Sequence, residues 1–155
     1  MKNIIKSIKG TRDEFPNSPN DIQDIERHLA MFMALHGYGE IRNPIIESTE
    51  LFKRSVGEHT DIVSKEMYTW TDVNGKSLTL RPEMTASVIR SYIQNQIWKQ
   101  EPSSKYYYIG PAFRRERPQK GRYRQFHQFG IEAIGSPYPE PVSYTHLTLP
   151  TILLV

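Results

Sequence analysis

The sequence predicts an α+β fold built on an antiparallel β-sheet. Two segments carry apolar residues at helical spacing, and the strand-like segments come in neighbouring pairs separated by turn residues. The resulting order is helix, strands, helix and antiparallel strands, which favours an α+β architecture over a parallel sheet with alternating helices. A length of 155 residues suggests one domain or a piece of one.

The first helix is expected to begin at Ser18-Pro19, because serine is a favoured N-cap residue and proline fits the first helical position. Residues with helical spacing follow: Ile22, Ile25, Leu29, Phe32, Met33 and His36. Gly37 stands where a C-terminal cap glycine belongs.

Two more helices are expected, a short one at 49–55 and a longer one at 83–97. The longer helix carries apolar residues along one side: Ala86, Ile89, Ile93 and Ile97.

The strands are predicted from turn residues and β-rich runs. In YGEIRNPII (38–46), Pro44 is placed at an edge or strand end because proline lacks an amide donor. MYTWTD and SLTLRP are typical of a hairpin, and Asn74-Gly75 between them suits the positive φ angles of a tight turn. Later strands are expected at 106–109, near 111–115 and at 123–134, with a loop near 116–122.

The net charge of +3 is concentrated in one short segment. Residues 1–113 are balanced, with 14 Lys/Arg and 14 Asp/Glu, whereas residues 114–124 carry six basic residues and one acid. Residues 125–155 carry two acids and no Lys or Arg. A basic patch of this kind is typical of a surface that meets a nucleotide or RNA. A solvated basic loop would give the same pattern.

The absence of cysteine excludes disulfides and thiolate metal sites and favours a reducing cytosol. The N-terminus has no apolar stretch long enough for a signal peptide, and no later stretch is long enough to cross a bilayer. The five histidines show no metal-ligand spacing, so no metal site is assigned. The expectation is a soluble cytoplasmic protein that does not enter the membrane.

Residues 108–135 are interpreted as a hairpin centred on Gly121, which places Arg114 opposite Gln128. Because side chains alternate along a strand, one face would carry an arginine, an amide, a glycine gap and a carboxylate: Arg114, Gln128, Gly130 and Glu132. Such a face suits a zwitterionic ligand next to a phosphate. The opposite face would be apolar and pack on the core: Phe129, Ile131 and Ala133.

Each of these residues also has a structural alternative. Arg114 could form a surface salt bridge, which usually contributes little, and Gly130 could mark a bulge. Glu132 could simply face solvent, and Phe126 could belong to the core.

Four segments, in order, resemble the histidyl-tRNA synthetases, which are class II aminoacyl-tRNA synthetases. FRRERPQKGRYRQFHQFGIE, within 108–135, resembles motif 2, and GYGEIRNPIIESTELF (37–52) resembles motif 1 with Pro44 as its proline. IKGTRDEFP (8–16) resembles the family's N-terminal signature, and TLRPEMTASVIR (79–90) resembles the segment that holds the ammonium group of the amino acid.

The resemblance implies a histidine–tRNA ligase, which activates histidine with ATP to histidyl-adenylate and then esterifies tRNA(His). By position in motif 2, Arg114 would be the catalytic arginine that grips the α-phosphate and the substrate carboxylate. Glu116, Arg122 and Phe126 would contact ATP, with Phe126 stacking on adenine. The loop 117–124 would approach the acceptor end of tRNA, and Mg²⁺ is expected only with the ATP phosphates.

For the amino acid, Glu83, Thr85 and Gln128 match the family's ammonium-binding positions, and Glu132 matches the position that hydrogen-bonds the imidazole ring. A carboxylate there can accept the ring N–H and fix its tautomer. The structural alternative for Glu83 and Thr85 is capping of the helix that begins there. Many family members have glycine where Met84 stands, which leaves the local backbone shape open.

The resemblance also implies how much of the synthetase this chain covers and how the full-length parent assembles. Residues 1–141 would be the N-terminal part of the catalytic core, without motif 3 or an anticodon-binding domain, and residues 142–155 would be a non-native tail. Motif 1 implies that the full-length parent is a homodimer. Two alternatives remain: a paralogue that serves as the regulatory subunit of ATP phosphoribosyltransferase, which does not preserve the basic motif 2 hairpin, and an inactive truncated product.

Overall fold

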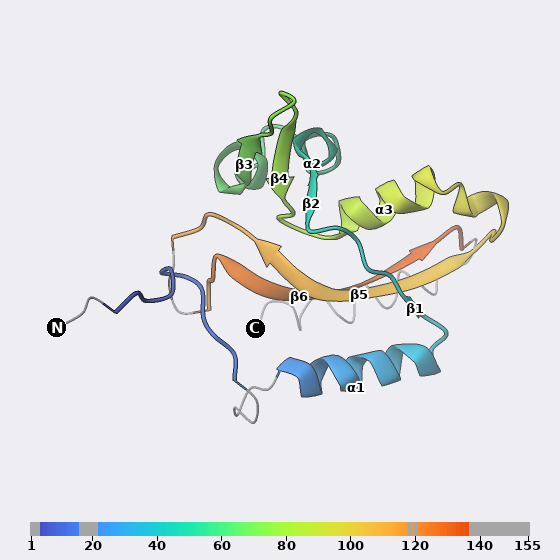
Figure 1. The fold of residues 1–155 in the computed structure, drawn as a ribbon. Coiled ribbons are helices and arrows are strands. Elements are labelled where there is room, and N and C mark those ends of the chain that lie inside the picture. The colour runs from blue at the N-terminus through green and yellow to red at the C-terminus, as the bar shows by residue number, and fades with distance from the viewer. Residues whose placement is uncertain (1–3, 16–21, 118, 120, 137–155) are drawn as a thin grey trace.

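The computed structural model describes residues 4–15, 22–117, 119 and 121–136. A long antiparallel hairpin, β5 (Ser104–Phe113) and β6 (Gln125–Ile134), forms the middle layer. Helix α1 (Ile22–Leu35) lies on one side of this hairpin, and α3 (Thr85–Gln94) lies on the other (Figure 1). The α+β class with antiparallel strands is therefore confirmed.

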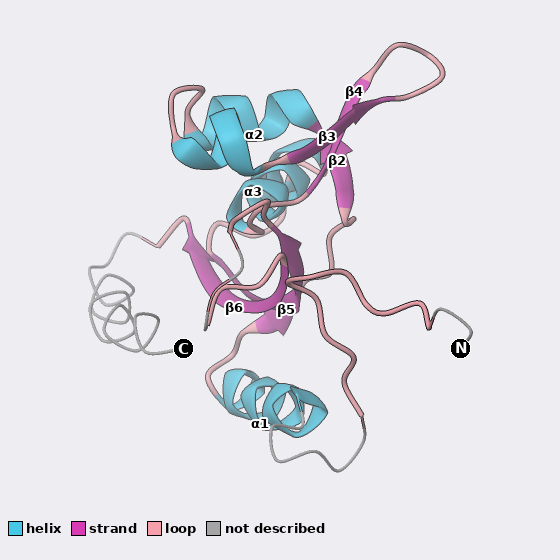
Figure 2. Cartoon of the chain, turned by 90° about the vertical axis from the view of Figure 1, so that its left-hand side faces the viewer, coloured by secondary structure: helices cyan, strands magenta, loops and turns pink. Residues whose placement is uncertain are grey.

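The described residues form two three-stranded sheets. In the first, β1 (Gly39–Glu40) pairs in parallel with β5, and the strand order is β1-β5-β6. The second has the antiparallel order β2-β4-β3, from β2 (Ile46–Ser48), β4 (Ser77–Leu80) and β3 (Tyr68–Thr71). Figure 2 shows this second sheet with α2 (Thr49–Val56) on the α3 side of the hairpin, opposite α1. The short helix expected at 49–55 is thus confirmed.

Pro44 lies between β1 and β2, where the chain passes from one sheet to the other. Pro44 is thus part of neither strand, and the predicted single interrupted strand is in fact two strands in different sheets. The missing amide of proline costs no ladder bond at such a crossing.

Helix α1 ends as the sequence predicts. Gly37 has φ +74°, its amide donates to the carbonyl of Ala34 at 3.1 Å, and the amide of Tyr38 donates to the carbonyl of Met33 at 3.0 Å. These two bonds are the Schellman arrangement, and Met33 and Tyr38 also share a buried cluster. The predicted start at Ser18-Pro19 lies outside the described residues, as does the predicted tail at 142–155.

The β3–β4 hairpin is confirmed, but its predicted turn is wrong in detail. Gly75 has φ +78°, whereas Asn74 does not have a positive φ. The Asp72 carboxylate instead accepts the amides of Asn74 at 2.9 Å and Lys76 at 2.8 Å. Because this side chain organises a longer loop, the backbone needs only one left-handed residue.

The second long helix is shorter than the predicted 83–97, because α3 ends at Gln94. Gln96, at φ +53°, separates α3 from a 3₁₀ turn (Ile97–Lys99). The buried residues of α3 are Ala86, Ser87 and Val88. Of the apolar residues along its predicted side, Ala86 is buried, whereas Ile89 and Ile93 are exposed in the described chain.

The hairpin register differs from the prediction. β5 is one continuous strand, Phe113 lies opposite Gln125, and Gln128 lies opposite Gly110 rather than Arg114. The amide of Arg114 donates instead to the carbonyl of Arg124 at 3.0 Å. The difference of four residues is even, so every side chain keeps its predicted face. The ladder runs through Gly130 without interruption, which excludes the bulge.

The apolar face of the hairpin packs on α1, as predicted. Met33, Tyr38 and Tyr107 form its buried cluster, and the half-buried residues against it are Ala30, Ile109, Phe129 and Ile131. Within the described residues, no helix has the length and apolar character to cross a membrane.

Candidate functional site

Arg114 stands just beyond the end of β5, on the face of the hairpin turned away from α1. Its Nε donates to the carbonyl of Pro82 at 2.9 Å, and its guanidinium lies 5.2 Å from the centre of the Phe126 ring. The ion pair with Glu116 is long, at 4.0 Å. Backbone and ring contacts therefore hold the guanidinium in place, which does not fit the surface salt-bridge alternative.

Glu116 and Arg122, both predicted ATP contacts, pair with each other across the basic loop at 3.3 Å. The loop is also tied to the N-terminal signature. The amide of Arg124 donates to the carbonyl of Gly10 at 2.6 Å, and the Arg12 guanidinium lies 5.1 Å from the centre of the Tyr123 ring. This contact between two distant segments was missed by the sequence analysis.

Arg81 is a second residue that the sequence analysis missed. Its side chain is only 3% exposed, and it donates to the carbonyls of Pro111 and Asn43, both at 2.8 Å. Burial lowers the pKa of this guanidinium. The amide of Arg81 donates to the carbonyl of Ile45, and its carbonyl accepts the amide of Phe113. Arg81 therefore joins the two sheets and fixes the neighbouring Pro82, whose carbonyl accepts the hydrogen bond from Arg114.

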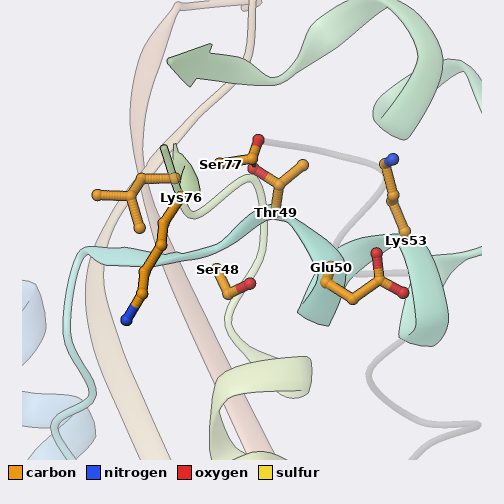
Figure 3. Close-up of a pocket in the computed structure, with 7 residues that line it drawn as sticks. Ser48, Thr49, Glu50, Lys53, Lys76 and Ser77 are labelled. Atoms are coloured by element: carbon orange, nitrogen blue, oxygen red, sulfur yellow. Dashed lines mark hydrogen bonds between the residues drawn. The ribbon is translucent and has the colours of Figure 1, made fainter. Parts of the chain in front are cut away.

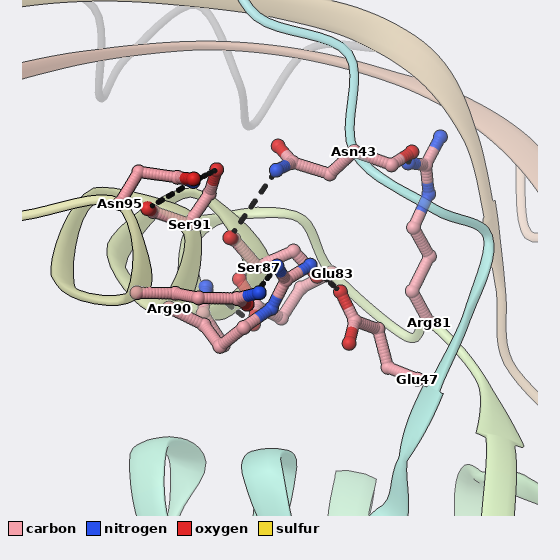
Figure 4. Close-up of polar contacts among 10 residues, drawn as sticks. Asn43, Glu47, Arg81, Glu83, Ser87, Arg90, Ser91 and Asn95 are labelled. Carbon is pink, nitrogen blue, oxygen red and sulfur yellow. Dashed lines mark hydrogen bonds and ion pairs between the residues drawn. The ribbon is translucent and has the colours of Figure 1, made fainter.

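The segment that resembles motif 1 is joined to α3 by further polar contacts (Figure 4). The side-chain amide of Asn43 donates to the carbonyl of Ser87 at 3.3 Å, and Glu47 pairs with Arg90. These contacts fix the helix that begins with the predicted ammonium-binding residues.

Glu83 and Thr85 behave differently at the start of α3. Glu83 Oε1 accepts the amide of Ala86 at 3.0 Å, so the capping alternative is confirmed for Glu83. Thr85 makes no such cap; its hydroxyl lies 3.1 Å from the hydroxyl of Tyr108. Met84, between them, is buried against Val88 and Tyr108 with φ −115°, an ordinary backbone conformation.

Glu132 is half-buried and does not simply face solvent. The Tyr108 hydroxyl donates to its Oε1 at 3.4 Å. Burial raises the pKa of Glu132, hydrogen bonds from Thr85 and Tyr108 oppose this rise, and the negative charge of Glu83 adds to it. Tyr108 was also missed by the sequence analysis, because the predicted register did not place it opposite Gly130.

Gln128 lies on the same face as Glu132, and its side-chain Oε1 is buried without a hydrogen-bond partner in the described part of the chain. A buried amide oxygen in this state is costly unless something donates to it. An ammonium group would satisfy it.

The structure thus brings the predicted residues onto one face of the hairpin as two groups. The first group, at the loop end of the hairpin, is Arg114, Phe126, Glu116 and Arg122, and the second, where α3 begins, is Glu83, Thr85 and Glu132. Gln128 stands between Phe126 and Glu132 along β6. Among the described residues, no group of three or more His, Asp or Glu is placed to hold a metal ion.

Two cavities lie elsewhere. One of about 290 Å³ opens at the start of α2, and Figure 3 shows the amino groups of its Lys53 and Lys76 pointing in different directions. The other, of about 500 Å³, lies between α1 and the hairpin and is bordered by Arg81 and His127. Neither cavity is lined by the predicted site residues.

A family model described as histidyl-tRNA synthetase matches residues 10–143. The chain belongs to this family. A histidine–tRNA ligase of Solibacter usitatus (strain Ellin6076) is 57% identical over 136 residues, which cover 88% of this chain and 33% of that protein. One from Syntrophotalea carbinolica is 56% identical over 131 residues, covering 84% and 31%. The chain therefore spans about a third of the length of the curated synthetases it matches.

Solved structures agree with this family. Apo histidyl-tRNA synthetase of S. aureus has a TM-score of 0.74 at 40% identity, covering 96% of this chain and 34% of that one. A Bacillus halodurans protein described as an ATP phosphoribosyltransferase regulatory subunit/histidyl-tRNA synthetase has a TM-score of 0.73 at 24% identity, covering 91% and 35%. At that identity the second likeness shows the fold alone.

Proposed function

We propose that the full-length protein carrying this synthetase segment is a histidine–tRNA ligase. It would activate L-histidine with ATP to histidyl-adenylate and transfer the histidyl group to tRNA(His). The observation that carries the proposal is one hairpin face with a fixed arginine, Arg114, at one end and a half-buried carboxylate, Glu132, further along. Relatives at 57% and 56% identity are named histidine–tRNA ligases.

The first step needs alignment of two anions rather than a protein nucleophile. The substrate carboxylate attacks the α-phosphate of ATP and displaces pyrophosphate. Arg114 suits this step, because its planar fork can bond phosphate and carboxylate oxygens and its orientation is set by Pro82 and Phe126. Preorganised charge of this kind stabilises the transition state without rearrangement during the reaction.

ATP would lie over Phe126, with Arg122 and Glu116 at its edge. Glu116 is already paired with Arg122, so ATP would have to share or displace that ion pair. Mg²⁺ would arrive with ATP and neutralise phosphate charge, and such ions usually keep several water ligands. The described residues contribute no clustered carboxylates to it.

Histidine would lie with its ammonium group near Gln128, Thr85 and Glu83 and its ring N–H on Glu132. The buried Gln128 Oε1 without a partner supports the ammonium site. Glu83 can serve both as helix cap and as ligand, since its cap uses one carboxylate oxygen. The basic loop 117–124 would meet the tRNA acceptor end, and its charge favours that partner.

The full-length protein is proposed to be a cytoplasmic homodimer that uses motif 1 at its interface. Ile45 and Ile46, within the motif 1 segment, are exposed, which supports a covered surface there. Exposed apolar side chains on the preceding helix α1 support an extension of that surface: Ile25, Met31, Phe32 and Leu35. Ile89 and Ile93 of α3 are exposed as well, as expected if the rest of the catalytic domain covers them. The 155 residues alone are proposed to be inactive.

The test is histidine-dependent exchange of pyrophosphate into ATP by the full-length protein, followed by charging of tRNA(His). Exchange that responds to histidine and to no other amino acid is expected. A protein that exchanges nothing but binds the catalytic subunit of ATP phosphoribosyltransferase would instead be the regulatory paralogue.

A further inference from the structure

Tyr108 occupies the centre of the hairpin face that carries the proposed site. Its side chain is 3% exposed, and its hydroxyl lies 3.1 Å from Thr85 Oγ1 and 3.4 Å from Glu132 Oε1. It therefore joins the start of α3 to the carboxylate on β6.

Gly130 leaves the space that the ring of Tyr108 occupies. It lies opposite Tyr108, and a Cβ atom placed there would fall 2.2 Å from both the ring carbon Cζ and the hydroxyl oxygen of Tyr108. No real side chain tolerates that distance, so any larger residue at 130 would push the ring away from Glu132. The glycine is thus needed for close approach of the ring.

The protons in this group can be assigned from its chemistry. An ionised carboxylate only accepts, and each hydroxyl donates one proton. Burial raises the pKa of Tyr108 to about 12, so its hydroxyl stays protonated and can donate to Glu132. Thr85 can then donate to the phenol oxygen or to the carboxylate. One oxygen of Glu132 is held in this way, and the other can accept an N–H group.

We propose that Tyr108 is the positioning residue that orients Glu132 and keeps it ionised, and so selects a ligand ring that donates an N–H. The inference rests on the proposed function, because the ring is taken to be the imidazole of histidine. Tyr108 itself need not touch the substrate.

The groups around Glu132 have opposite effects on its pKa. Burial and the charge of Glu83 favour the neutral acid, whereas the hydroxyls of Tyr108 and Thr85 favour the carboxylate. From β5, Tyr106 lies directly opposite Glu132. Because the Tyr108 hydrogen bond stabilises the charged form, its removal should raise the pKa of Glu132 and shift the acid limb of activity to higher pH.

The experiment is Tyr108→Phe in the full-length protein, assayed by histidine-dependent ATP–pyrophosphate exchange across pH. We expect the KM for histidine to rise about tenfold, as is typical when a hydrogen bond to a charged group is lost. The KM for ATP should stay within about twofold, and the acid limb of kcat/KM for histidine should move to higher pH. Ionisation of histidine itself is common to both proteins and cancels in the comparison.

Tyr107→Phe is the matched control, because Tyr107 is the next residue, is also buried, and packs on the α1 side of the same strand. It should leave both KM values and the pH profile unchanged. Gly130→Ala should raise the KM for histidine as Tyr108→Phe does, because the ring must leave its place.

The outcomes distinguish a failure of the proposed function from a failure of the positioning role of Tyr108. If the unaltered protein shows no histidine-dependent exchange, the proposed function fails. If it exchanges normally and Tyr108→Phe matches it in KM and pH profile, the proposed function stands and the role of Tyr108 is overturned. Equal rises in the KM for ATP and for histidine would also overturn it.

Discussion

The two faces of the β5–β6 hairpin use the same strands for different purposes. The face toward α1 is apolar and packs around Met33 and Tyr107. The face toward α3 carries a half-buried carboxylate, a tyrosine hydroxyl and an amide oxygen without a partner in the described part of the chain. Alternation of side chains separates the two environments within a single strand. Changes on the first face should therefore affect stability, and changes on the second should affect catalysis.

The largest effect is expected for Arg114→Ala in the full-length protein. Histidine-dependent ATP–pyrophosphate exchange should fall about 100- to 1000-fold, because a preorganised charge at the reacting phosphate is lost. Arg115→Ala is the control, since it removes the same charge from the adjacent exposed residue. Near-normal exchange after Arg114→Ala would remove Arg114 from its proposed role.

Met33→Ala tests the packed face. Met33 is 7% exposed between α1 and the hairpin, so its truncation should lower the free energy of unfolding by about 2–4 kcal/mol. Denaturant unfolding monitors this, and exchange activity per folded molecule should not change. Val73→Ala, in the loop between β3 and β4 and 101% exposed, is the control and should cost no more than about 0.5 kcal/mol. A comparable loss at Val73 would mean that burial at Met33 is not the cause.

Glu132→Gln tests the ligand face with little change of shape. It removes a charged acceptor, so the KM for histidine should rise about tenfold or more, while the KM for ATP changes far less. Steady-state exchange kinetics with each substrate varied in turn measure the two values. Equal losses for both substrates would argue against a contact specific to the imidazole.

The smallest effect concerns the glycine that ends α1. Gly37→Ala should cost about 1 kcal/mol of stability, because φ +74° is strained for any residue with a Cβ even where space is open. Gly39→Ala is the control: no positive φ is present there, and a Cβ would make an ordinary 3.9 Å contact. Similar losses at both glycines would mean that backbone conformation is not the cause.

Patterns among neighbouring residues correctly predicted several elements of this fold. The Gly37 cap, the helix at 49–55, the β3–β4 hairpin and the apolar face of β6 depend on neighbouring residues, and all are confirmed. The face of each site residue on β6 was also predicted correctly, because an even register error does not change faces.

The register itself could not be predicted from Gly121 alone. The basic loop is held by the N-terminal segment, through the bond from Arg124 to Gly10, and by the bond from Arg115 to Glu66. These partners are far away in the sequence, and hairpin registers with longer loops depend on such contacts. The wrong register prevented the prediction of a role for Tyr108, because only the observed register places Tyr108 opposite Gly130.

The sequence by itself determined the strand and helix periods, the position of the basic charge and the set of residues on one hairpin face. Only the tertiary structure decided that Tyr108 joins Thr85 to Glu132 and that Arg81 is buried between the two sheets. The physical reason is that periodicity fixes the direction of a side chain relative to its own strand. Which group it then meets depends on segments that come together only when the chain folds.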